Sequence, residues 1–124
     1  MPKTDSLGQF EQLVLTAILS LKDNAYGVTI HEKVEELQSK SASLGAIYVT
    51  LDRLEDKGFI SSQLSDPTPE RGGRSKRHYQ LESRGERALQ ESMAAARRMF
   101  AAVEESWGAL DVLGRRKWKP IRQD

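Results

Sequence analysis

The chain has 124 residues, of which 38% are hydrophobic and 30% are charged, and its formal net charge is +1. This length supports one domain, or one domain with an appended helix. The absence of cysteine excludes disulfide bonds and thiolate metal sites. No apolar run approaches the roughly 18–20 residues that span a bilayer, and the N-terminus lacks the apolar core of a signal peptide. We therefore expect a cytoplasmic protein without a membrane partner.

The near-neutral total charge hides two basic segments. Between Arg71 and Arg77 there are four basic residues and no acid, and between Arg115 and Arg122 there are five basic residues, again without an acid. Phosphate groups respond to such local fields rather than to the total charge. Both segments are therefore candidates for contact with nucleic acid, although the second fits a solvated chain end equally well.

The first predicted element is an amphipathic helix over about residues 7–21. Apolar side chains recur at steps of three and four from Phe10 to Leu21, which is the spacing of one helix face. Leu15 and Leu19 lie off this stripe and widen the apolar surface. We therefore expect the helix to contact two neighbours, and we predict that Leu15 and Leu19 contribute to an interface with a second copy of the chain.

A second helix is predicted from residue 26 or 27 to about residue 38, after a short connection. Its apolar side chains Ile30, Val34 and Leu37 are predicted to be buried. Tyr26 is expected to pack where the helix begins, and Gly27 to allow a close approach of neighbouring structure. We assign both residues a structural role.

A third amphipathic helix is predicted over residues 43–57, with a serine available as its N-cap and Gly58 at its end. The leucine and isoleucine residues at positions 44, 47, 51 and 54 recur at helical spacing and are predicted to face inward. The opposite face is small, neutral or basic, with no acid before Asp52, and such a face can approach a DNA groove without repelling phosphates. The residues that we predict to contact DNA from this helix are Ser43, Ala46, Tyr48, Val49, Thr50 and Arg53.

Two of these residues have alternative interpretations. Tyr48 lies at the edge of the apolar stripe, so it fits a partly buried core ring as well as a hydroxyl that reaches DNA. Arg53 fits a contact with the DNA backbone or an ion pair with Asp52, Glu55 or Asp56 on its own helix.

Two short strand patterns follow, at residues 59–64 and 79–81, with proline and glycine clusters between them. The intervening tip, residues 67–77, contains the segment Arg71-Gly-Gly-Arg-Ser-Lys-Arg77. A basic hairpin after a groove-sized helix is typical of the wing of a winged helix-turn-helix. The alternative is a soluble hairpin tip without a binding role. The wing residues that we predict to contact phosphate or the minor groove are Arg71, Gly72, Gly73, Arg74 and Lys76.

A long amphipathic helix is predicted over residues 83–108, followed by a basic, loose tail over residues 109–124 that contains Gly114 and Pro120. The apolar stripe of this helix has no obvious partner within so small a domain, so we expect it to pack on a second copy of the chain. The predicted interface residues on this helix are Leu89, Met93, Ala96, Met99, Phe100, Val103 and Trp107.

Several motifs occur in the order found in one family of bacterial regulators. They are Leu7-Gly, Glu11, Leu13-Val-Leu, Ala25-Tyr-Gly, Ile30, Ser43-Leu-Gly-Ala-Ile-Tyr-Val-Thr-Leu-Asp-Arg-Leu-Glu, Lys57-Gly, Arg71-Gly-Gly-Arg and Tyr79-Gln-Leu. Over residues 7–89 the chain closely resembles the PadR family, which is related to the repressor of phenolic acid decarboxylase. The resemblance implies a winged-helix domain, a dimer joined largely through the C-terminal helix, and operator binding by two copies. The C-terminal helix looks short, as in the smaller branch of the family.

No chemistry beyond binding is predicted. Some relatives hold flat aromatic ligands between tryptophans, but Trp107 fits the end of the dimer stripe better than a ligand site, and Trp118 lies in the basic tail. His31 and His78 lie far apart and lack metal-ligand spacing. The chain has no nucleophile–base pair, carboxylate pair or metal cluster with convincing spacing. We therefore expect no metal, no cofactor and no enzymatic activity, and a small-molecule effector stays an open question.

The sequence as a whole predicts a mainly α fold with a two-stranded β wing (α+β). Residues 7–82 are predicted to form a winged helix-turn-helix DNA-binding domain, residues 83–108 a dimerisation helix, and residues 109–124 the tail. The predicted function is a dimeric repressor that binds double-stranded DNA at an inverted repeat. The alternatives are a protein–protein interaction module and a nucleic-acid binder without sequence preference.

Overall fold

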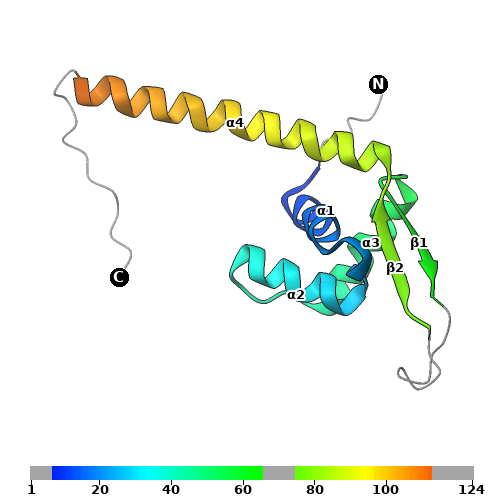
Figure 1. Cartoon of the computed structure of the whole chain (residues 1–124). Helices are drawn as coiled ribbons and strands as arrows, with labels where there is room; N and C mark the ends of the chain where they lie inside the picture. Colours follow the sequence, from blue (N-terminus) through cyan, green and yellow to red (C-terminus); the bar gives the residue numbers. More distant parts are fainter. Residues whose placement is uncertain (1–6, 66–74, 113–124) are drawn as a thin grey trace. The chain divides into compact units, whose positions relative to one another are not determined.

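The computed structural model describes residues 7–65 and 75–112, and it contains four α-helices, a short 3-10 helix and a two-stranded sheet (Figure 1). The chain divides into two compact units, Met1–Ser92 and Met93–Asp124, so that the first part of the last helix belongs to the first unit. In chain order the elements are α1 (Gln9–Leu21), η1 (Lys22–Asn24), α2 (Gly27–Gln38), α3 (Leu44–Asp56), β1 (Ile60–Leu64), β2 (Arg77–Leu81) and α4 (Ser83–Val112). The mainly α fold with a two-stranded wing is confirmed.

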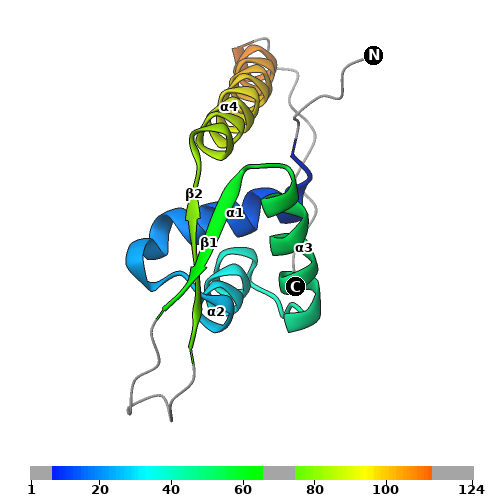
Figure 2. The same cartoon turned by 90° about the vertical axis from the view of Figure 1, so that its right-hand side faces the viewer.

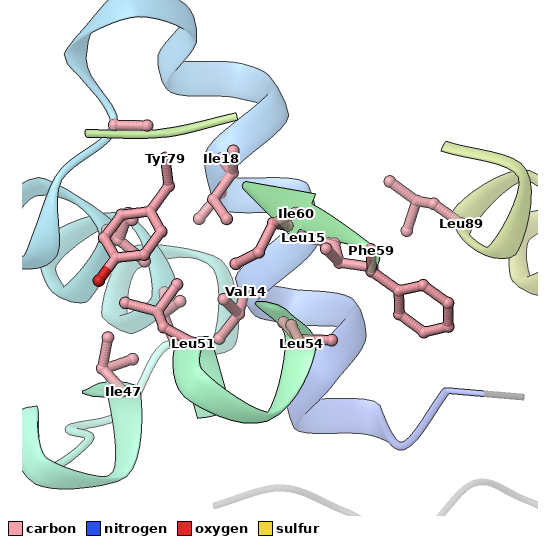
Figure 3. Close-up of a cluster of buried hydrophobic side chains, with 14 of the residues drawn as sticks. Val14, Leu15, Ile18, Ile47, Leu51, Leu54, Phe59, Ile60, Tyr79 and Leu89 are labelled. Atoms are coloured by element: carbon pink, nitrogen blue, oxygen red, sulfur yellow. The ribbon is translucent and has the colours of Figure 1, made fainter. Parts of the chain in front are cut away.

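The core of the first unit lies where α1, α2 and α3 meet the base of the sheet (Figure 3). Its members come from the three helices, from both strands, from the residues that precede α2 and β1, and from the start of α4. Burial of these side chains is the main stabilising contribution to such a domain. The buried residues are Val14, Leu15, Ala17, Ile18, Ala25, Ile30, Val34, Ile47, Leu51, Leu54, Phe59, Ile60, Tyr79, Ala88 and Leu89.

The turn between α2 and α3 is held by side chains of α2. Ser39 ends α2 in the left-handed region at φ 57°. The Glu35 carboxylate accepts a hydrogen bond from the Ala42 N–H at 2.9 Å, and His31 Nε2 lies 2.6 Å from the Ala42 carbonyl oxygen. The Ser43 hydroxyl oxygen then caps α3 by accepting from the Ala46 N–H at 2.9 Å. These contacts fix the direction in which α3 leaves α2, and the predicted serine cap is confirmed at Ser43.

The two strands form an antiparallel ladder that runs from the pair Ile60↔Leu81 to the pair Leu64↔Arg77 (Figure 2). Beyond the last pair, the Ser65 N–H donates to the Lys76 carbonyl at 2.8 Å. The second strand therefore begins earlier than the predicted residue 79. Gly58 follows α3 as predicted, and its φ of 80° is the left-handed conformation that a glycine at the end of a helix commonly adopts.

The residues that precede α2 pair with the edge of β2 that β1 leaves open. The Tyr79 N–H donates to the Ala25 carbonyl at 2.9 Å, and Tyr26 forms an isolated antiparallel bridge with His78. The start of α2 is therefore tied to β2, and the wing is held directly against the helix-turn-helix.

Four burial predictions need correction. Leu15 is fully buried and Leu89 is only 8% exposed, so both belong to the core of their own chain and are not available to a second copy. Leu37 and Leu44 are 43% and 40% exposed, although they were predicted to face the core. Both lie at the end of a helix, where the apolar stripe runs past the packed neighbours.

The last helix continues beyond its predicted end. It runs through Gly108 to Val112, because a single exposed glycine costs only about 1 kcal/mol relative to alanine in a helix. Residues 113–124, which include most of the predicted tail, lie outside the described part of the chain. Within the second unit, α4 exposes large apolar side chains, namely Met93, Met99, Phe100, Val103, Trp107 and Leu110.

Candidate nucleic-acid interface

The outer face of α3 is exposed as predicted at most of its candidate DNA-binding positions. Ser43, Ala46 and Arg53 are exposed, and Val49 is 57% exposed. The helical period explains this pattern, since the buried residues Ile47, Leu51 and Leu54 occupy the opposite side. These side chains are accessible to a groove.

Thr50 does not share this exposure. Its residue is only 5% exposed, between the buried positions 47 and 54 on the same helix face. A side chain buried in its own domain cannot touch a base or a phosphate directly. The prediction that Thr50 contacts DNA is therefore corrected, and the residue instead packs α3 against the core.

Tyr48 is 43% exposed and lies against the start of α2, so it is neither a core ring nor a fully free side chain. A Cβ atom built on Gly27 would overlap the Tyr48 hydroxyl and ring. The close approach predicted for Gly27 is confirmed, and the group that approaches is Tyr48 from the next helix. The absence of a side chain at residue 27 thus sets the position of the Tyr48 ring.

The root of the wing presents two positive charges beside these tyrosines. The Lys76 ammonium lies 3.9 Å from the centre of the Tyr26 ring, a cation–π contact, and the Tyr26 ring meets His78 edge-on with centroids 5.6 Å apart. An Arg77 guanidinium nitrogen donates to the Ser62 hydroxyl at 3.0 Å. Both cations therefore have defined neighbours that restrict where they lie.

These groups surround an open depression of about 530 Å³ at the junction of α2, α3 and β2. Burial of the Tyr79 ring is the main reason why the pKa of its hydroxyl is raised above the ordinary value of 10.0, so this hydroxyl is neutral near pH 7. The charged groups at the rim are thus cationic. The lining residues are Tyr26, Gly27, Val28, Tyr48, Ser75, Lys76, Arg77 and Tyr79.

The wing is also tied to the end of α3. The Ser62 hydroxyl donates to a Glu55 carboxylate oxygen at 2.8 Å while accepting from Arg77. Ser62 was not among the predicted site residues, and Arg77 was included only as part of the basic segment of residues 71–77. Strand alternation in the sequence does not indicate this contact, because it depends on the register that pairs Ser62 with Tyr79 and turns Ser62 to the same side of the sheet as the buried Tyr79 ring.

A second connection missed at the sequence level joins α1 to the end of α3. Lys57 Nζ lies 2.9 Å from a Glu11 carboxylate oxygen, and the other Glu11 oxygen accepts from the Gly8 N–H at 3.0 Å. Burial alone would raise the pKa of Glu11. The hydrogen bonds from Lys57 and Gly8, with the charges of Lys57 and Arg53, outweigh burial and hold the pKa below 4.5.

Arg53 makes no ion pair with Asp52, Glu55 or Asp56 within residues 7–65 and 75–112. The intrahelical alternative is therefore not observed there, and a backbone contact for Arg53 stays a prediction. The predicted wing-tip contacts Arg71, Gly72, Gly73 and Arg74 lie outside the described residues, as does Trp118.

Comparison with known proteins identifies the family of this chain. Residues 14–91 match the model of the transcriptional regulator PadR-like family. The chain belongs to the PadR-like family. Its members regulate transcription by binding DNA, and the family is not one of enzymes. The predicted resemblance is thereby confirmed.

Solved structures of PadR-like regulators share the fold. A PadR family transcription regulator from Clostridium difficile is 28% identical, with a TM-score of 0.67, and the match covers 81% of this chain and 99% of that one. A PadR-like transcription factor from Bacteroides fragilis is 25% identical, with a TM-score of 0.64 and coverage of 79% and 89%. A PadR family regulator from Eggerthella lenta, at 21% identity and a TM-score of 0.61, shows the fold alone, over 77% of this chain and 81% of that one. No curated protein sequence matches this chain.

Among the helices in the described part of the chain, none has the length and apolar character needed to cross a lipid bilayer. Within the same ranges, no three His, Cys, Asp or Glu side chains are grouped so that they could hold a metal ion.

Proposed function

We propose that this PadR-like regulator is a homodimeric repressor that binds an inverted-repeat operator in double-stranded DNA. In each half-site α3 enters the major groove, and the wing contacts the adjacent backbone or minor groove. One observation carries the proposal: the exposed face of α3 has no acid from Leu44 to Leu51 and adjoins a depression rimmed by Lys76 and Arg77.

Positive charge around this depression favours a polyanion as the partner. Lys76 and Arg77 have restricted positions, so they lose less side-chain freedom when they meet phosphates than free lysines and arginines would. Arg53 extends the positive charge to the third turn of α3, and Arg71 and Arg74 extend it along the wing sequence. The affinity is expected to depend mainly on these phosphate contacts and to fall steeply with salt concentration.

Exposed apolar side chains on α4 support the dimer. Phe100 is 62% exposed and Trp107 is 44% exposed, and aromatic residues of this size are typical of buried interface cores. Leu19 on α1 is 52% exposed and is proposed as an additional contact. The remaining proposed interface residues lie on α4 and are Met93, Ala96, Met99 and Val103.

A gel-shift titration on the promoter of its own gene, with unrelated duplex as competitor, tests the proposed function. We expect a shifted complex that unrelated DNA displaces only at large excess. Equal competition would identify a binder without sequence preference, and no shift at all would favour the protein–protein interaction module. Repression is tested separately by a reporter gene under the same promoter, whose output should rise when the regulator is deleted.

A further inference from the structure

The exposed face of α3 offers few hydrogen-bonding groups over its first two turns. From Leu44 to Val49 the exposed positions carry only apolar groups and one tyrosine, with Val49 57% exposed. Gly45 and Ala46 lie one turn before Val49 and are also exposed. A helix surface with such small residues beside one branched side chain can approach the floor of a groove closely.

Two polar side chains lie at this end of α3, and each lies close to neighbouring backbone. The Ser43 hydroxyl oxygen accepts from the Ala46 N–H at 2.9 Å, and the Tyr48 hydroxyl lies against Gly27 at the start of α2. No asparagine, glutamine, lysine or arginine occurs between residues 44 and 52. These are the side chains that read adenine and guanine through paired hydrogen bonds. The first such residue is Arg53, a full turn beyond Val49.

Only one group on the floor of the major groove is apolar, namely the C5 methyl group of thymine. We propose that Val49 reads thymine methyl groups in each half-site, with Gly45 and Ala46 allowing the close approach. This inference rests on the proposed function, since it requires α3 to occupy the major groove. Arg53 lies one turn after Val49, and the neighbouring Tyr48 lines the depression rimmed by Lys76 and Arg77. Basic residues near the exposed face of α3 suit a groove whose edges are lined by phosphates.

The size of the effect follows from the burial of one methyl group. Removing a buried methyl group lowers affinity about fourfold. An inverted repeat presents two symmetry-related contacts, so removing both methyl groups should lower affinity about fifteenfold. Asp52, the exposed acid that follows on α3, accepts hydrogen bonds but makes no apolar contact, so it does not contribute to this discrimination.

Replacement of thymine by deoxyuracil tests the inference, because it removes the methyl group and leaves Watson–Crick pairing unchanged. The probe is the duplex selected by the full-length protein from a random pool, synthesised with thymine or with deoxyuracil at individual half-site positions. We expect wild-type affinity to fall by about the stated factors at one symmetry-related position. Val49→Ala should bind the thymine duplex more weakly and should not distinguish it from the deoxyuracil duplex.

Control variants distinguish a loss of the Val49 contact from a general loss of binding or folding. Leu37→Ala removes a comparably exposed apolar side chain from the far end of α2 and should retain the full discrimination. Val49→Ala raises helix propensity, so loss of folding is not expected. Equal wild-type affinity for both duplexes, or the same loss in wild type and Val49→Ala, overturns the inference while sequence-specific binding stands. If the random pool yields no preferred duplex, the proposed function fails, and the inference fails with it.

Discussion

The exposed face of α3 and the apolar stripe of α4 beyond Ser92 both present apolar side chains, yet they differ in side-chain size and in neighbouring charge. On α3 the exposed face includes the small residues Gly45, Ala46 and Val49, with Arg53 one turn after Val49 and the depression rimmed by Lys76 and Arg77 beside Tyr48. On α4 the exposed groups are large, and they include Phe100 and Trp107. Small apolar groups within a cationic surround suit the floor of a groove, whereas large aromatic groups suit a protein interface. Exposure alone therefore does not identify a partner.

The largest effect should come from disrupting the α4 surface. The double substitution Phe100→Asp/Trp107→Asp places two charges in the proposed dimer contact, so the protein should become monomeric in sedimentation velocity. Operator affinity should fall by about 100-fold or more, because one half-site loses the benefit of the second. The matched control is Ala94→Asp/Ala101→Asp, which adds the same charge to exposed positions on the other side of α4 and should stay dimeric. A dimeric Phe100→Asp/Trp107→Asp variant would refute the α4 interface.

The wing should act on affinity without altering sequence preference. Replacing Arg71, Arg74 and Lys76 together by alanine should lower affinity at least about tenfold for every duplex and should flatten the salt dependence by about three units of slope per protomer. Gel-shift titrations at several salt concentrations measure both quantities. Unchanged affinity would show that the wing assignment is wrong.

The position of Tyr48 should depend on the glycine at residue 27. Gly27→Ala should destabilise the domain by about 1 kcal/mol, because the new Cβ atom overlaps the Tyr48 ring and the ring must move. In a Tyr48→Ala background the same change should cost almost nothing. Urea denaturation of the four proteins gives this double-mutant cycle. An equal loss of stability from Gly27→Ala in both backgrounds would show that the loss does not arise from contact with Tyr48.

The smallest effect should come from the Glu11–Lys57 pair, which touches neither surface. The pKa of folded Glu11 lies below 4.5, so the pair contributes stability above that pH and loses it as the pH falls through the folded-state pKa. Because the Lys57 side chain is 40% exposed, Glu11→Gln should cost only about 0.5 kcal/mol near pH 7. Denaturant titrations from pH 7 to 3 should show a weaker acid dependence for the variant. Operator affinity and dimerisation should not change.

Much of the fold was predictable because apolar residues follow the helical period closely. The three helices of the winged helix-turn-helix, a serine cap before α3 and Gly58 at the end of α3 were all predicted from local pattern. The errors occurred where periodicity does not specify a neighbour. Leu15 lies off the apolar stripe of its helix, and Leu89 lies on a stripe that had no obvious partner, but neighbouring elements of the same chain bury both. Thr50 was predicted to contact DNA from the flank of the helix, although its position on α3 turns it inward.

In the candidate site, too, local pattern placed some residues and tertiary structure placed others. Local pattern was enough to place Ala46, Val49 and Arg53 on the open face of α3, because that depends only on 3.6 residues per turn. Tertiary structure alone brought Tyr48 against Gly27, Lys76 over Tyr26, and Ser62 between Glu55 and Arg77. These contacts join residues from different elements, and their geometry depends on how the helices and strands pack. Helix and strand periodicities encode which face a residue occupies, whereas packing of the core decides which side chain it meets there.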